Sequence, residues 1–266
     1  MEYEVKNIKT EKYDMPYILM HGGPKNMIVI PGMGFRPISS SPEGFVNAFS
    51  SFLDEYTIYL FDRKQNMDDD YSIKDRSDDI IDACKKLGLK NLYVYGASMG
   101  GFITQHMCID YPEMIKKAVI ASASYYLNEI GEDFMDNIIK YGEEKDVKNL
   151  VAFSIRRIYS KEFNDLNHEG IMKTYADMNE YEIKQYEEDA IAFKKEGYLL
   201  KDLEKVETDI LLIASKEDNV FGYEPTLLMA YKIKNNECVI YDGYSHGVYD
   251  EAPDFRDRMR AFFDKK

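Results

Sequence analysis

The chain of 266 residues is 45% hydrophobic and 31% charged, so it can bury the core of one large α/β domain with an insertion. Its net charge of −14, from 34 basic and 48 acidic residues, opposes binding to nucleic acid phosphates and to anionic lipid heads. We therefore expect neither nucleic acid nor a membrane as a partner, and the composition leaves the oligomeric state open.

Cysteine usage and the amino terminus both bear on the cellular compartment. The three cysteines, Cys84, Cys108 and Cys238, form an odd set without paired spacing, so we predict buried free thiols rather than a disulfide framework. The first residues are charged and lack an apolar targeting segment. No apolar run approaches the roughly 18 residues that a membrane-spanning helix needs. These features predict a reduced, intracellular, cytoplasmic protein.

Eight short runs are predicted to form strands. They lie at residues 2–10, 15–21, 27–31, 57–61, 91–95, 118–122, 209–214 and 238–241. The first two are predicted to pair as an antiparallel hairpin at the start of the sheet. The run at 27–31 is almost entirely apolar, which is typical of a strand that is buried on both faces of a parallel sheet.

Helices are predicted between most of these strands. Their ranges are 41–53, 72–87, 102–110, 224–234 and 252–263. Ser41 is expected to cap the first helix, with Pro42 at its first position, and Gly88 is expected to close the second. The acidic run at 68–70, just before the second helix, is predicted to be a solvated loop rather than a cation site.

Residues 125–206 interrupt this alternation of strands and helices. No strand pattern appears there, and four amphipathic helical patterns follow one another, with apolar residues spaced three and four apart. The chain is therefore predicted to comprise a core domain, residues 1–124 and 207–266, and a helical insertion, residues 125–206.

The most informative motif is the stretch Gly96-Ala97-Ser98-Met99-Gly100-Gly101, which joins a predicted strand to a predicted helix. This context places Ser98 at the tip of a sharp, strained turn. The glycines two residues before and two residues after Ser98 remove the collisions that larger side chains would cause there. The backbone amide of Met99, at the start of the helix, points to where a negative oxygen would develop.

This G-x-S-x-G pattern resembles the nucleophile elbow of the α/β-hydrolase family. The resemblance implies a mostly parallel sheet of about eight strands flanked by helices, with residues 125–206 as a cap over the nucleophile that shapes an acyl pocket. It extends to residues 32–34, in the position of the family's oxyanion loop, where Pro31 replaces the usual histidine. The implied oxyanion donors are the backbone amides of Met33 and Met99, so this replacement removes no donor.

A serine hydroxyl needs a base within hydrogen-bond reach, and the base needs an orienting acid. Of the four histidines, His246 follows the last predicted strand, which is the family's position for the base. The order Ser98, Asp218, His246 matches the order of the family's triad. Asp218 is favoured over Glu217 because Ser215 then occupies the family's glycine position. The other histidines are predicted to lie elsewhere: His21, His106 and His168.

Several charged residues near these motifs are given no catalytic role. The loop that starts at Asp62-Arg63 lacks the glycine of the family's corresponding loop, so no chemistry is assigned to it. Arg36 could meet a substrate carboxylate, but we expect an exposed loop arginine. Acidic residues of the insertion, Glu143, Glu144 and residues 187–189, could hold a substrate amine, and we predict solvated helix faces instead.

The predicted function is that of a serine hydrolase, which cleaves a small apolar carboxylic ester through an acyl-enzyme intermediate. A small molecule is the expected partner, and no cofactor or metal is expected. Three other reactions on the same site stay open, those of an aminopeptidase, an acyltransferase and a C–C hydrolase. A member of the fold that binds a small molecule without catalysis is a further alternative.

Overall fold

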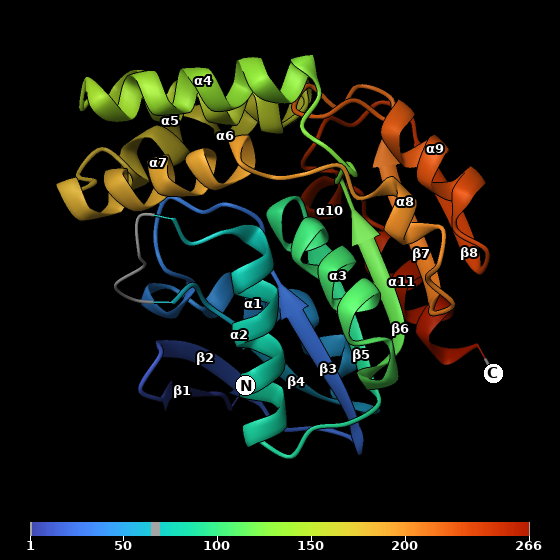
Figure 1. Ribbon diagram of the computed structural model, residues 1–266. Coiled ribbons are helices and arrows are strands. Elements are labelled where there is room, and N and C mark those ends of the chain that lie inside the picture. Colours follow the sequence, from blue (N-terminus) through green and yellow to red (C-terminus); the bar gives the residue numbers. More distant parts are fainter. Residues whose placement is uncertain (1, 65–69, 266) are drawn as a thin grey trace.

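The computed structural model, which describes residues 2–64 and 70–265, is built around one eight-stranded sheet (Figure 1). The strands are β1 Glu4–Lys9, β2 Asp14–Met20, β3 Lys25–Ile30, β4 Tyr56–Phe61, β5 Leu92–Ala97, β6 Ile115–Ala121, β7 Asp209–Ser215 and β8 Asn236–Tyr241. Their spatial order is β1-β2-β4-β3-β5-β6-β7-β8. Strands β3 to β8 pair in parallel, whereas β2 pairs antiparallel with β1 and β4. The predicted mostly parallel sheet is confirmed.

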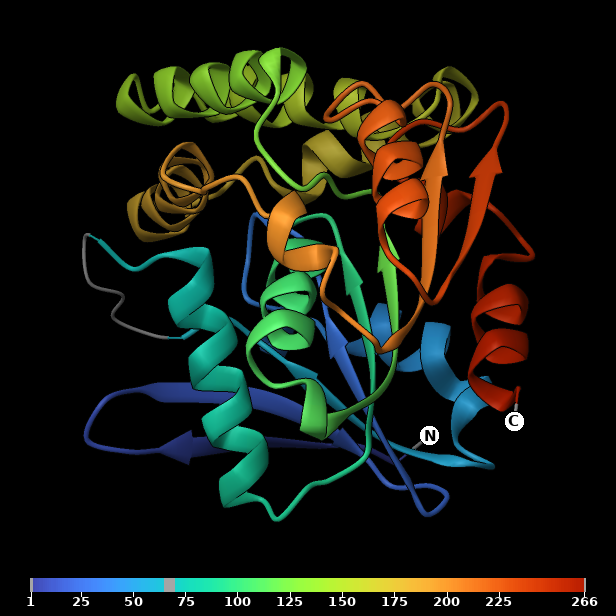
Figure 2. The same cartoon turned by 45° about the vertical axis from the view of Figure 1, so that its right-hand side comes forward.

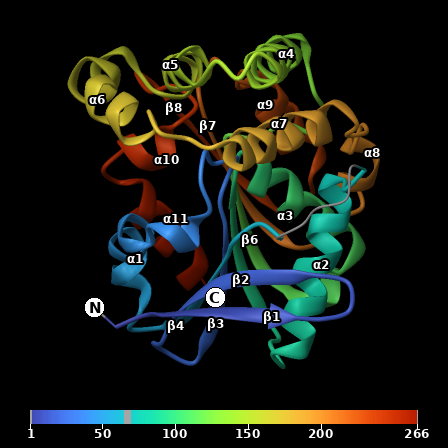
Figure 3. The ribbon, with the colours of Figure 1, turned by 90° about the vertical axis from the view of Figure 1, so that its left-hand side faces the viewer.

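Helices cover both faces of the sheet (Figure 3). The helices of the core are α1 Glu43–Phe49, α2 Ile73–Lys86, α3 Met99–Asp110, α9 Glu224–Lys232, α10 Val248–Glu251 and α11 Phe255–Asp264. Successive residues of β3 alternate between the two resulting cores. Ile28 and Ile30 pack with residues of α2 and α3, and Met27 and Val29 pack with residues of α1 and α11. This central strand is therefore buried on both faces.

Helix α2 has clear sequence signals at both ends. The Ser72 side chain accepts a hydrogen bond from the Asp75 backbone amide, and the Asp75 carboxylate accepts one from the Ser72 amide, which completes a capping box. Gly88 follows the helix with a φ of +71°, a conformation that favours glycine. The predicted acidic loop at 68–70 lies almost wholly outside the described residues.

Two local predictions were wrong. Ser41 does not cap α1, because the helix begins at Glu43 and Pro42 occupies the flanking cap position instead of the predicted first helical position. Cys238 is exposed, because β8 forms an edge of the sheet. Cys84 and Cys108 are buried as predicted, and this burial raises the pKa of both thiols to about 12.

Between β6 and β7 the chain forms a helical insertion, which consists of α4 Glu129–Glu143, α5 Val147–Ile158, α6 Lys161–Thr174, α7 Glu180–Lys194 and α8 Leu200–Leu203. Helices α4 to α7 form a layer beyond the carboxyl ends of the parallel strands (Figures 1 and 2). Helix α4 packs on α5 and α7, whereas the short α8 packs on α3 and α9 of the core. Among the described residues, no helix is both long and apolar enough to cross a membrane.

Candidate active site

Ser98 lies in the turn between β5 and α3, with a φ of 53° and a ψ of −117°. A positive φ is unfavourable for a residue with a side chain, and it persists where the surrounding structure imposes it. Two close approaches impose it here. A Cβ atom added to Gly96 would lie 2.1 Å from the Gly100 carbonyl oxygen, and one added to Gly100 would lie 1.9 Å from the Ile30 carbonyl oxygen. Only glycine fits at these two positions, so the turn depends on both.

The predicted oxyanion loop lies directly against the Ser98 side chain. A Cβ atom added to Gly32 would lie 2.9 Å from Ser98 Cβ and 3.5 Å from Ser98 Oγ. Met99 is the first residue of α3, so its amide belongs to the first turn of the helix, where backbone N–H groups lack helical partners. The Ser98 hydroxyl thus lies between the loop after β3 and the amino-terminal end of α3.

Asp218 and His246 form a buried hydrogen-bonded pair. His246 Nδ1 lies 2.9 Å from Asp218 Oδ2, and the two residues are 2% and 5% exposed, respectively. The second carboxylate oxygen, Oδ1, accepts hydrogen bonds from the amides of Val220 at 2.7 Å and Phe221 at 2.9 Å. The neighbouring Glu217 accepts a hydrogen bond from the Gly243 amide instead. The carboxylate is therefore held on one side by backbone amides and bonds the imidazole on the other.

Aromatic rings surround the His246 imidazole. The Phe221 ring lies 5.5 Å from it and the Tyr249 ring 6.2 Å from it, both in edge-to-face orientation. Burial holds the pKa of the Tyr249 hydroxyl well above its usual value. That tyrosine therefore stays neutral beside the imidazole, and Asp218 is the acid that contacts the ring.

Strand β6 connects the Ser98 turn to the His246 loop. The Ser98 amide donates to the Ala121 carbonyl at 2.9 Å, and the Ser122 hydroxyl donates to the His246 carbonyl at 2.7 Å. Within the described parts of the chain, no hydrogen bond joins Ser98 Oγ to His246. The structure thus brings the acid and the histidine into contact and places the serine at the adjoining strand end. Catalytic hydrogen bonds are often long in enzymes without substrate and tighten when it binds.

The carboxyl end of α5 contacts the loops of both Asp218 and His246. Arg157 Nε donates to the carbonyl of Asn219, the residue after the acid, at 2.7 Å. The Arg157 carbonyl accepts a hydrogen bond from Ser245 Oγ at 3.0 Å, and the Ile158 carbonyl accepts one from the Gly247 amide at 2.6 Å. Both neighbours of the histidine are therefore bonded to the insertion.

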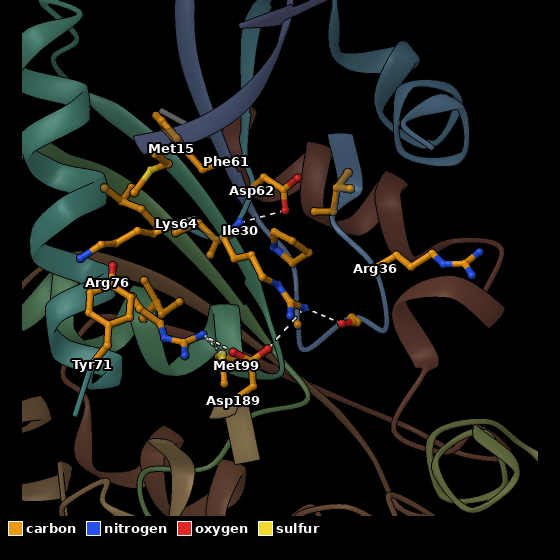
Figure 4. Close-up of a pocket in the computed structure, with 17 residues that line it drawn as sticks. Met15, Ile30, Arg36, Phe61, Asp62, Lys64, Tyr71, Arg76, Met99 and Asp189 are labelled. Carbon is orange, nitrogen blue, oxygen red and sulfur yellow. Dashed lines mark hydrogen bonds and ion pairs between the residues drawn. The ribbon is translucent and has the colours of Figure 1, made fainter. Parts of the chain in front are cut away.

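A pocket opens beside the predicted oxyanion loop, with an empty volume of about 560 Å³ that includes open solvent. Gly32 and Met99 line it, together with an unusual number of charged side chains (Figure 4). These are Arg36, Asp62, Arg63, Lys64, Arg76 and Asp189. The loop that begins at Asp62, for which no chemistry was predicted, is thus part of the pocket wall.

Asp189 of α7 is 1% exposed and lies between two core arginines. Arg76 of α2 reaches its Oδ1 at 2.6 Å, and Arg63, which follows β4, reaches its Oδ2 at 3.3 Å. The prediction that residues 187–189 form a solvated face is therefore wrong for Asp189. A signal was present in the sequence, because Tyr186, Asp189 and Phe193 recur at the helical spacing of the buried face.

Arg36 also differs from its prediction. Its side chain is 26% exposed and joins the predicted oxyanion loop to the insertion, through Glu182 at 2.9 Å and Asp177 at 2.5 Å. It also donates to the Thr174 carbonyl at 3.0 Å. Figure 4 shows Arg36 pointing away from Arg76 and Asp189. It therefore contacts the insertion rather than solvent.

The remaining histidines and acids have other surroundings. His21 lies 2.6 Å from a Glu4 carboxylate oxygen, and His106 lies 3.1 Å from one of Glu196. His168 lines a surface cleft beside α6. Among the residues that the structure describes, no three His, Cys, Asp or Glu side chains are grouped so as to hold a metal ion.

Solved structures of several hydrolases share this architecture. An alpha/beta hydrolase enzyme from a Medee basin deep-sea metagenome library has a TM-score of 0.87 and 18% identity over 98% of both chains. The enol-lactonase from Burkholderia xenovorans has a TM-score of 0.84 and 11% identity over 98% of this chain and 100% of that one. An esterase from Exiguobacterium antarcticum has a TM-score of 0.81 and 18% identity over 97% of this chain and 99% of that one.

Two comparisons rest on the sequence. A homoserine O-acetyltransferase from Methanohalobium evestigatum is 29% identical over 182 residues, in an alignment that covers 60% of this chain and 36% of that protein. The match thus spans about a third of the relative's length. A family profile described as the alpha/beta hydrolase fold matches residues 18–253. That profile covers nearly the whole sheet, the elbow and the insertion, and the chain therefore belongs to the α/β-hydrolase fold family.

Proposed function

We propose that the protein is a serine hydrolase that cleaves carboxylic esters, with Ser98 as nucleophile, His246 as general base and Asp218 as the acid that orients it. The observation that carries this proposal is the buried bond of 2.9 Å between His246 Nδ1 and Asp218 Oδ2. An imidazole held through Nδ1 keeps its other nitrogen available for proton transfer. The strained Ser98 turn lies at the same edge of the sheet.

In this mechanism His246 Nε2 takes the Ser98 proton as Oγ attacks the ester carbonyl. The backbone amides of Met33 and Met99 stabilise the resulting oxyanion, and each such donor contributes about 3–4 kcal/mol to transition-state stabilisation. The imidazolium then gives its proton to the departing alcohol, which leaves an acyl-enzyme. Water attacks this intermediate with His246 again as base, and the acid product leaves.

Acyl transfer is the second candidate, because the acyl-enzyme could pass its acyl group to an alcohol instead of water. The similarity to a homoserine O-acetyltransferase favours it. The aminopeptidase alternative loses support, because Asp189, one of its candidate amine ligands, is already paired with Arg63 and Arg76. A substrate amine would have to displace a buried guanidinium to reach that carboxylate.

A fluorophosphonate probe followed by mass spectrometry tests the nucleophile. We expect one adduct, on Ser98, in the native protein and none in Ser98→Ala. On p-nitrophenyl esters, Ser98→Ala should lower kcat by at least about 10⁴-fold, because the nucleophile itself is removed. Ser124→Ala is the matched control, since this buried serine lies beyond β6 and has no role in the mechanism. A labelled native protein with its adduct at any other residue would refute the assignment.

The same substrates separate hydrolysis from acyl transfer. With a small alcohol such as homoserine present, a hydrolase releases the free carboxylic acid as its main product, whereas an acyltransferase releases the new ester. Chromatography of the products measures this partition directly. If the new ester is the main product, Ser98 is still the nucleophile, and the reaction is acyl transfer rather than hydrolysis.

A further inference from the structure

The charged pocket beside the predicted oxyanion loop has more cationic donors than its acid can satisfy. Two guanidinium groups, of Arg63 and Arg76, share the single carboxylate of Asp189. The Arg76 side chain is 8% exposed and that of Asp189 only 2%. At this place two positive charges face one negative charge, so one positive charge is left without a counterion in the contact.

One donor of this cluster is unused. Arg76 Nη1 is engaged by Asp189 at 2.6 Å and by Met99 Sδ at 3.0 Å, but its Nε is buried and has no acceptor among the described residues. Buried polar groups nearly always have a hydrogen-bond partner, and an unpaired donor is costly. Figure 4 shows the Arg76 side chain turned toward Asp189 and Met99, at the pocket wall.

The other acid of the pocket does not satisfy these arginines. Asp62 Oδ2 accepts hydrogen bonds from the amide of Ser39 at 2.8 Å and from its hydroxyl at 2.6 Å. Its Oδ1 accepts one from the backbone amide of Arg63 at 2.8 Å. The Asp62 carboxylate is thus bound by local uncharged donors, and among the described residues it forms no ion pair with either guanidinium group.

The position of the pocket connects this charge to the reaction. Gly32 and Met99 line the pocket, and Gly32 lies against the Ser98 side chain. The lining includes Met99, the residue after Ser98, but not Ser98 itself, so a short chain on Ser98 Oγ would have to pass Gly32 to enter the pocket. Its far end would meet Arg76 and Arg63, whose planar donors suit a carboxylate.

We propose that this pocket binds a carboxylate group of the substrate, so that the preferred esters carry a short acyl chain that ends in a carboxylate. The carboxylate accepts hydrogen bonds from Arg76 and Arg63 and neutralises the positive charge that Asp189 leaves. This inference rests on the proposed role of Ser98 and goes beyond it by naming the class of substrate. It differs from the prediction of a small apolar acyl group.

Two matched substrates test the proposal: the mono-p-nitrophenyl ester of glutaric acid and the same ester of glutaric acid monoamide, which has nearly the same shape and no charge. We expect the native enzyme to favour the acid over the amide by about 10- to 100-fold in kcat/KM, as hydrogen bonds to charged groups allow. Arg76→Gln should bring this ratio close to one. Arg156→Gln, which changes an exposed arginine on α5, should leave the ratio as in the native enzyme.

Two further variants keep the test informative if Arg76→Gln folds poorly. The triple variant Arg63→Met, Arg76→Met and Asp189→Leu removes the buried cluster as a unit, which proteins commonly tolerate, and should abolish the preference. Arg76→Lys keeps the charge but loses Nε, and should retain only part of the preference. A ratio near the native value in a folded triple variant would overturn the proposal.

A direct measurement of binding tests the carboxylate site independently of the proposed ester hydrolysis. Titration calorimetry of glutarate against the Ser98→Ala protein needs no turnover, and we expect binding that the triple variant lacks. If fluorophosphonate fails to label Ser98 while glutarate still binds, the reaction is wrong and the anion site stands. If esters are cleaved through Ser98 but glutarate does not bind and the acid is not preferred, the anion site is wrong and the reaction stands.

Discussion

The insertion meets the core at two places that differ in chemistry. On the side of the predicted oxyanion loop, α7 is joined to the core by charged side chains, with Asp189 between two buried arginines. On the side of His246, the end of α5 is joined to the loops of the acid and the histidine by three hydrogen bonds, each of which has a backbone carbonyl as its acceptor.

This difference indicates what each contact can do. Hydrogen bonds to backbone carbonyls fix the positions of the neighbouring loops without pairing opposite charges, so they suit the task of holding an acid–histidine pair in place. A buried cluster with two cations and one anion is expensive to desolvate, and it gains most when a further anion arrives. The α5 contact is therefore expected to position the loops, and the α7 contact to hold the insertion and recognise substrate.

The largest effect on stability is expected from Asp189→Ala. This change leaves the Arg63 and Arg76 guanidinium groups in the interior without a carboxylate, and removal of one partner from a buried ion pair typically costs about 3–5 kcal/mol. Urea denaturation, followed by circular dichroism, measures the free energy of unfolding. Added glutarate should recover part of the loss, because an anion that binds only the folded state stabilises it.

The control for that experiment is Glu187→Ala on the same helix. The carboxylate that it removes has no arginine partner among the described residues. A loss no greater for Asp189→Ala than for Glu187→Ala would show that the cluster at α7 does not hold the insertion to the core. The contrast between the two contacts would then disappear.

A smaller effect, on catalysis rather than stability, is expected from Arg157→Gln. The change removes the hydrogen bond to the Asn219 carbonyl and the ion pair with Asp133 at 2.8 Å, while the backbone bonds of residues 157 and 158 remain. We expect kcat to fall by about 3- to 10-fold, the effect of roughly one net hydrogen bond, with little change in KM. The rate of fluorophosphonate labelling of Ser98 should fall in parallel.

Arg156→Gln provides the matched control, because the neighbouring side chain is exposed. A structural role alone would lower the melting temperature and leave the labelling rate of the folded protein unchanged. That result would show that Arg157 stabilises the insertion and does not position Asp218.

The elbow at Ser98 and the charged contact at α7 were unequally predictable from the sequence. The elbow and the strand and helix that flank it follow from local patterns, because glycine spacing and apolar runs act within a few residues. The pairing of Asp189 with Arg63 and Arg76 depends on how α7 lies over the core, which no local pattern specifies. The helical spacing of Asp189 with Tyr186 and Phe193 indicated only that its side chain faces inward.

The edge position of Cys238 could not be predicted for a related reason. Its strand is as apolar as a central one over four residues, and exposure depends on the order of strands in the sheet. The Pro42 start of α1 likewise depends on the turn before it, which uses the Ser41 amide. Errors of this kind arise where a neighbour distant in sequence, or an adjoining turn, decides between two locally acceptable structures.

The smallest effect is expected from Asp177→Asn, which removes the exposed partner of Arg36. The Asp177 side chain is 84% exposed, so its ion pair is screened by water and should add nothing measurable to the melting temperature at neutral pH. The hydrogen bond from Arg36 lowers the pKa of the Asp177 carboxyl. Any stabilisation would thus be present above the carboxyl's ordinary pKa and lost as the pH falls through the lowered value. If thermal melts at neutral pH separate this variant clearly from the native protein, exposed ion pairs also hold the insertion to the core, and the distinction between the buried and the exposed ion pairs fails.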